Sequence, residues 1–169
     1  MELTDVQPVE KWMELEQDLV DRYQFQASVF NSEGVRITTS KSWANRLCPE
    51  IKGLEKGQTF ICAVAHMNMA NQARSTKEAV IEECDAGLLK LMVPVFWQED
   101  FMGVVGGCGL LAQDGEVDSF SINKLTDMAE ADIESLSAGI AVMPEDTAKE
   151  ACDYIRSRID QTLAACSRA

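Results

Sequence analysis

The sequence contains a single histidine, His66, and few basic residues. Its 15 lysines and arginines are outnumbered by 28 aspartates and glutamates, which gives a formal net charge of −13. A surface this acidic repels nucleic-acid phosphates and anionic lipid, so we expect no nucleic-acid partner. One histidine allows at most one Ser-His-Asp arrangement, and neither a phosphate loop nor a Gly-x-Gly-x-x-Gly motif is present. The usual sequence signatures of hydrolases and nucleotide-binding enzymes are therefore missing.

Long apolar runs are also absent. The first residues lack the basic segment and apolar stretch of a secretion signal, and no later window is long enough to cross a bilayer. We therefore expect a cytoplasmic protein with no membrane partner. In a reducing compartment, six cysteines indicate metal binding, redox chemistry or core packing rather than disulfides.

The length and composition are those of one globular domain. The chain has 169 residues, of which 46% are hydrophobic and 25% charged, and it contains no repeat or low-complexity segment. We expect a single domain over residues 1–169, with its core at about residues 12–160 and no effector domain.

The periodicity of apolar residues predicts an α+β fold. Apolar residues recur at helical spacing in residues 8–22, 58–77 and 122–140 and after Pro144, with a shorter helix at 43–51. Two β-hairpins are expected at 25–39 and 88–111, and a further strand at 79–83. This order predicts an antiparallel sheet flanked by helices, with amphipathic N- and C-terminal helices that also offer a surface for homodimer formation.

Glycine is concentrated in the last predicted strand. Gly103, Gly106, Gly107 and Gly109 leave one face of that strand with few side chains. A ligand, a helix or another part of the backbone can approach the sheet closely at such a place.

Several segments together resemble the PocR sensory domain family. They are Leu47-Cys48-Pro49-Glu50-Ile51, the helix that begins near Cys62, Glu83-Cys84-Asp85-Ala86-Gly87-Leu88, Val93-Pro94-Val95 and the glycine-rich run at 102–107. The resemblance extends over about residues 12–159. It implies a PAS-like or GAF-like fold that reports a small molecule. Members of the family are usually attached to a histidine kinase or a transcription regulator, so the resemblance implies a signalling partner of that kind.

The resemblance also singles out three cysteines, because the family's recurrent cysteines match Cys48, Cys62 and Cys84. Cys108 stands where the family more often has glutamine. Thiolates and imidazole suit zinc or an iron–sulfur cluster, and either Cys108 or His66 would supply a fourth ligand. Residues four apart on a helix share a face, so Cys62 and His66 would reach one point if the helix is continuous there.

Other roles for these residues remain open at this stage. No Cys-x-x-Cys pair is present, and free cysteine and histidine often serve as core residues. The acids beside Cys84 would raise its pKa and slow thiolate chemistry there.

A pocket for a small molecule would need an apolar wall and a few polar groups. Asn45, Asn68 and Asn71 are candidate polar groups. The candidate wall residues are aromatic residues and methionines from the predicted helices and strands: Trp43, Phe60, Met69, Met92 and Phe96.

Three functions follow from these observations. The first is a sensory module that binds a small molecule or a cysteine-ligated metal or cluster and signals through a partner protein. The second is a thiol-dependent redox enzyme of the methionine sulfoxide reductase type, or a thiol redox sensor. The third is a scaffold that binds a partner through its acidic surface.

Overall fold

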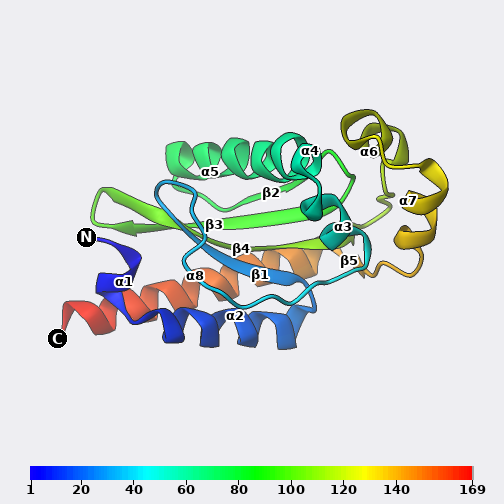
Figure 1. Cartoon of the computed structure of the whole chain (residues 1–169). Coiled ribbons are helices and arrows are strands. Elements are labelled where there is room, and N and C mark those ends of the chain that lie inside the picture. The colour runs from blue at the N-terminus through cyan, green and yellow to red at the C-terminus, as the bar shows by residue number, and fades with distance from the viewer. Residues whose placement is uncertain (169) are drawn as a thin grey trace.

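The computed structural model describes residues 1–168, in which a five-stranded sheet lies between two layers of helices (Figure 1). Four strands are antiparallel in the order β1-β4-β3-β2, and β5 adds to β4 in parallel. Their bounds are β1 Gln26–Asn31, β2 Val80–Glu83, β3 Leu89–Trp97, β4 Asp100–Ala112 and β5 Val142–Met143. The predicted antiparallel sheet flanked by helices is confirmed.

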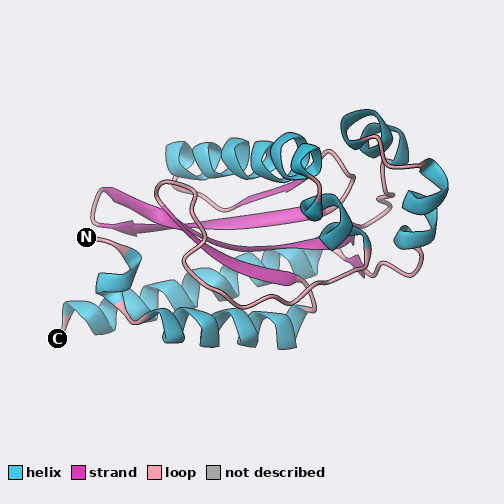
Figure 2. Cartoon of the chain, in the orientation of Figure 1, coloured by secondary structure: helices cyan, strands magenta, loops and turns pink. Residues whose placement is uncertain are grey.

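The helices divide between the two faces of the sheet and one end (Figures 1 and 2). The lower face in Figure 1 is covered by three helices: α1 Leu3–Val6, α2 Val9–Tyr23 and α8 Glu145–Ser167. The upper face is covered by α4 Glu55–Gly57, the π-helix η1 Gln58–Ala63 and α5 Val64–Thr76. The remaining helices, α3 Leu47–Gly53, α6 Ser119–Thr126 and α7 Glu130–Ser137, lie toward one end. No helix within residues 1–168 combines the length and apolar character needed to span a membrane.

Alternating residues of β3 build two cores. Leu91 and Val93 belong to the lower core together with Trp12 of α2 and Ile155 of α8. Met92 belongs to the upper core, with residues of α5 and β4. Because successive side chains of a strand point to opposite faces, this division fixes which β3 side chains face α5. A third core joins α3, η1, α6 and α7 at the end of the sheet.

Residues 35–39 do not form the predicted second strand of the first hairpin. Only an isolated bridge between Phe30 and Arg36 is formed, and β1 pairs with β4 instead. Two backbone hydrogen bonds flank this bridge, from Asn31 to Val35 and from Ile37 to Val29. The side chains of Arg36 and Thr38 in addition hydrogen-bond the buried carboxylate of Glu16 on α2. We call residues 32–46 the connecting loop, since they lead from β1 to α3.

Two predicted helices are also interrupted. The helix expected at 122–140 is two helices, because Asp127 adopts a left-handed conformation with φ 64° and caps α6. The helix expected at 58–77 begins with the π-helix η1 before α5 continues it. These interruptions reorient the side chains beyond them.

Candidate functional site

Four cysteines from four separate elements line one small cavity. Cys48 lies on α3, Cys62 on η1, Cys84 directly after β2 and Cys108 on β4. The cavity has a volume of about 60 Å³ and lies against the upper face of the sheet, beside η1 and α3. All six cysteines of the chain are free thiols, and these four are half-buried. The fold therefore gathers at one place sulfurs that are up to 60 residues apart in sequence.

The floor of this thiol cavity is a row of side chains across three strands. The Cα of Cys108 is paired with that of Gln26 on β1 and with that of Lys90 on β3. Paired residues of neighbouring antiparallel strands point to the same face, so all three side chains line the cavity. The side chain of Cys108 thus lies between those of Gln26 and Lys90 on the sheet.

Asn45, at the end of the connecting loop, holds Cys48 against β4. Its Nδ2 donates to the carbonyl oxygen of Gly109 at 2.7 Å and to the sulfur of Cys48 at 3.2 Å. Its Oδ1 accepts a hydrogen bond of 2.7 Å from the backbone N–H of Cys48. One side chain therefore joins the loop, α3 and the sheet at the edge of the cavity.

Gly109 makes this close approach of the loop feasible. Its φ is +100°, a conformation that side chains with a Cβ rarely adopt. A Cβ at this position would lie 3.0 Å from that of Ala44 and 3.3 Å from Nδ2 of Asn45. The glycine-rich face of β4 thus receives side chains of the connecting loop here.

The π-helix η1 determines where Cys62 points. A π-helix closes its hydrogen bonds between residues five apart, so its side chains do not follow the four-residue spacing of an α-helix. Cys62 lines the thiol cavity, whereas His66 on α5 does not. The expected pairing of Cys62 with His66 required a continuous α-helix, which the structure does not have at this point.

His66 lies instead in an apolar environment beneath α5. It is 8% exposed, and its ring centroid is 4.1 Å from that of Phe30. Neither ring nitrogen has a hydrogen-bond partner within residues 1–168. Burial, together with the positive charges of Lys90 and Lys52, lowers the pKa of His66 to about 4. The imidazole is therefore neutral near pH 7.

Burial dominates the protonation of the cavity thiols. It raises the pKa of Cys48 to about 12, and it also raises the pKa values of Cys62 and Cys84. Lys52 and Lys90 oppose this rise at Cys62, and hydrogen bonding from the backbone of Leu88 and Ala86 opposes it at Cys84. These three thiols are consequently protonated near pH 7.

The groups that oppose the rise in the thiol pKa values are those that would stabilise a thiolate. Asn45 donates to the sulfur of Cys48, and the ammonium groups of Lys52 and Lys90 lie at the cavity wall. Within residues 1–168 neither lysine has an ion-pair partner. The surroundings of the cavity thus offer hydrogen-bond donors and two lysines to the sulfurs that line it.

The five candidate wall residues do not gather at the cavity. Only Trp43 lines it, from the connecting loop. Met69 and Met92 pack together in the upper core. Phe60 is 48% exposed, and Phe96 packs against Phe101 in the β3–β4 hairpin with 5.5 Å between ring centroids. Apart from Trp43, these residues are placed as core or surface residues.

The four sulfurs surround the cavity rather than meeting at one point. Among residues 1–168 no group of three or more His, Cys, Asp or Glu side chains is placed to hold a metal ion. An occupant held by these sulfurs must therefore be larger than one ion or must draw the sulfurs inward as it binds.

Sequence reasoning missed the lysines of the site. Lys52 follows Cys48 by four residues on α3, a spacing that puts both on one helix face and was available from the sequence. Lys90 and Gln26 depend on strand register, which composition does not reveal.

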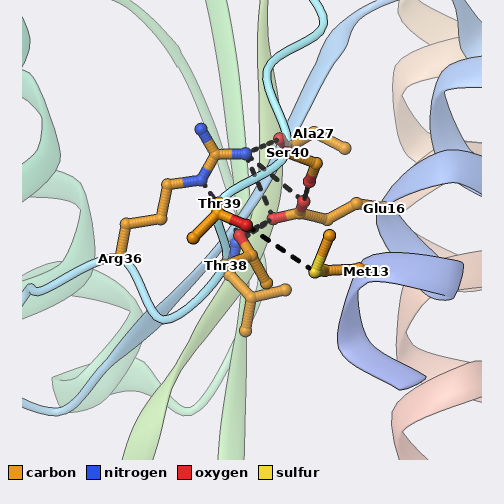
Figure 3. Close-up of polar contacts among 8 residues, drawn as sticks. Met13, Glu16, Ala27, Arg36, Thr38, Thr39 and Ser40 are labelled. Carbon is orange, nitrogen blue, oxygen red and sulfur yellow. Dashed lines mark hydrogen bonds and ion pairs between the residues drawn. The ribbon is translucent and has the colours of Figure 1, made fainter. Parts of the chain in front are cut away.

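The connecting loop links the cavity to α2 through Glu16 (Figure 3). The side chain of Glu16 is 3% exposed and accepts hydrogen bonds from the hydroxyls of Thr38 and Ser40 and from the backbone N–H of Val29. Arg36 pairs with the same carboxylate at 3.3 Å. The loop that carries Trp43 and Asn45 to the cavity is thus fastened to α2 by a buried carboxylate.

Comparison with known proteins assigns the chain to a family. Residues 5–165 match the family model described as the sensory domain found in PocR. No curated protein and no solved structure matches the chain. Because the match extends over nearly the whole sequence, the chain belongs to the family of sensory domains found in PocR.

Proposed function

We propose that this protein is a cytoplasmic sensory module whose input site is the thiol cavity and whose occupant is a metal centre bound by Cys48, Cys62, Cys84 and Cys108. The observation that carries the proposal is the convergence of these four thiols on one cavity. The family supports the sensory role, and six free cysteines fit a reducing compartment.

The charges around the cavity favour a metal centre. Four thiolates around a divalent ion or an iron–sulfur cluster leave an excess of negative charge, and Lys52 and Lys90 are placed to balance it. Metal binding deprotonates thiols that burial keeps neutral. Hydrogen bonds such as that from Asn45 to Cys48 are the interactions that orient and tune such ligands.

We favour an iron–sulfur cluster over zinc, because the sulfurs line a cavity and form no preformed ion site within residues 1–168. A cluster occupies the volume between its ligands, whereas tetrahedral zinc requires all four sulfurs within about 2.3 Å of one point. The sulfurs line a cavity of about 60 Å³ and do not form a preformed ion site within residues 1–168.

The output of the module would pass through the terminal helices. Asp18 of α2 accepts hydrogen bonds from Tyr154 and Arg158 of α8, so the two helices are joined on one face of the sheet (Figure 1). Occupancy of the cavity would act on Asn45 and the connecting loop, and through Glu16 on α2. A kinase or transcription regulator, or a second copy of this chain, would read the position of these helices.

Purification without oxygen, followed by metal analysis and a visible spectrum, tests the proposal. We expect about one centre per chain, brown if it is a cluster and colourless if it is zinc. The substitutions Cys48→Ser, Cys62→Ser, Cys84→Ser and Cys108→Ser should each lower the metal content. Cys166→Ser, on α8 and outside the cavity, should not. Metal-free protein, or equal content in all five variants, would refute the metal centre.

A thiol redox function is the second candidate, because the same four free thiols line one cavity. The raised pKa of Cys48 opposes it, since thiolate is the reactive form. Reversible disulfide formation by the metal-free protein, or turnover of oxidised methionine with a dithiol, would favour this function over a metal centre.

A further inference from the structure

A second pocket adjoins the thiol cavity and carries positive charge. It has a volume of about 400 Å³ and is lined by Arg36, Lys41 and Lys52 together with Trp43 and the amide side chains of Gln26 and Gln58. Lys52, Trp43 and Gln26 also line the thiol cavity, so the two spaces share a wall. Its size is in the range of sites that bind small molecules.

No aspartate or glutamate of residues 1–168 lines this pocket, although the chain is acidic. Acidic residues outnumber basic ones by 28 to 15 in the sequence, yet no carboxylate of residues 1–168 lines the pocket. Lys41 and Lys52 have no ion-pair partner within residues 1–168. Like charges that are brought together without counter-charge favour a bound anion.

Arg36 supplies a donor that is already oriented. Its Nε and Nη2 bond to Thr38, Glu16 and the carbonyl oxygen of Ala27, which fixes the guanidinium plane. Nη1 has no such contact in Figure 3, where it lies on the side away from Glu16. A planar guanidinium held in this way binds carboxylate or phosphate with little loss of side-chain freedom.

We propose that this pocket binds a small organic anion, with its carboxylate or phosphate at Arg36, Lys41 and Lys52 and its apolar part against Trp43. Arg36 and Lys41 line this pocket and not the thiol cavity, whereas Lys52 lines both. An anion bound at Nη1 would share the guanidinium that pairs with Glu16 and so act on the same contact between the connecting loop and α2. The module would then receive two inputs at one loop.

Benzoate and phenyl phosphate are suitable probes, with neutral benzamide as the ligand control. Titrations followed by the NMR signals of the Trp43 indole and the Arg36 guanidinium should saturate at millimolar concentration with at least one anion and not with benzamide. A preference for one probe distinguishes a carboxylate ligand from a phosphate ligand, and either result supports the proposal.

Two charge variants test the location. Lys41→Gln and Lys52→Gln should each weaken binding about tenfold, the effect of losing one favourable charge contact. Lys56→Gln is the control, because Lys56 pairs with Asp127 away from the pocket. Lys41 lies outside the thiol cavity, so Lys41→Gln should leave metal content unchanged and separates this proposal from the metal centre. No saturable binding of either anion, or equal binding by the Lys41 and Lys56 variants, would overturn the inference.

Discussion

Glu16 and Arg36 form a buried ion pair between α2 and the connecting loop. Their side chains are 3% and 18% exposed, and the Arg36 guanidinium contacts both carboxylate oxygens at 3.3 Å (Figure 3). The carboxylate also accepts three other hydrogen bonds, from Val29, Thr38 and Ser40. A pair satisfied in this way holds its partners in one arrangement, and removing one member leaves the other without compensation.

The first prediction concerns this pair. Glu16→Gln keeps the size of the side chain but leaves Arg36 without a counter-charge, and we expect it to lower the free energy of unfolding by about 3 kcal/mol. Urea titration measures the change. Glu14→Gln is the control, because Glu14 pairs with Lys11 at the exposed surface of the same helix and should change stability by less than about 1 kcal/mol. Equal effects of the two substitutions would contradict a structural role for the pair.

The second prediction concerns the place where the loop touches the sheet. Gly109→Ala introduces a Cβ at φ +100° and within 3.0 Å of Ala44, so it should destabilise the protein by about 1–3 kcal/mol. It should also displace Asn45 and make Cys48 more reactive toward iodoacetamide.

Gly53→Ala is the matched control. No atom lies within 4 Å of a Cβ placed on Gly53, and its φ is not positive. We expect this control to leave both stability and the labelling of Cys48 nearly unchanged. If Gly109→Ala behaves in the same way, the loop does not need the glycine.

The third prediction concerns the thiols of metal-free protein. Because burial raises the pKa values of Cys48, Cys62 and Cys84, few thiolates form near neutral pH. Native protein should therefore be alkylated at these positions far more slowly than urea-unfolded protein, and mass spectrometry of the labelled peptides measures this. Labelling at the unfolded rate would show that the cavity is open and hydrated.

The fourth prediction concerns His66, whose pKa in the folded protein is lowered to about 4. Below the ordinary value of about 6.5 the unfolded chain binds a proton at this residue and the folded chain does not, so stability falls as pH falls. This residue should remove about 2 kcal/mol of stability between about pH 8 and pH 5.

His66→Leu tests the assignment, because it removes the titrating group and two unpaired ring nitrogens. The variant should be more stable than the parent at pH 5, by a larger margin than at pH 8. Equal pH dependence of the two proteins would mean that His66 does not titrate as its burial requires.

The layered architecture could be predicted from the sequence, but some secondary-structure elements could not. The apolar repeats identified the long helices α2 and α8, because burial of one helix face leaves a regular signature. The segment at 35–39 looked like a strand. It forms only a short bridge to β1, and its side chains hydrogen-bond Glu16, which lies twenty residues before Arg36 in the sequence. The local sequence pattern of residues 35–39 cannot reveal a hydrogen-bond partner that is so distant in the sequence.

Some residues of the site could likewise be predicted from the sequence, and others could not. The family resemblance pointed to Cys48, Cys62 and Cys84, and the glycines of β4 indicated a close approach at Gly109. The alignment of Lys90 with Cys108 depends on register, including an irregularity beside Lys90, and is set by the whole sheet. The π-helix that separates His66 from the cysteines has no reliable sequence signature.

The most direct test of the metal centre is a crystal structure of protein prepared without oxygen, with anomalous data at the metal edge. We predict anomalous signal in the thiol cavity, with the sulfur of each of Cys48, Cys62, Cys84 and Cys108 about 2.3 Å from a metal atom. An empty cavity, or a metal bound elsewhere in the chain, would contradict the account.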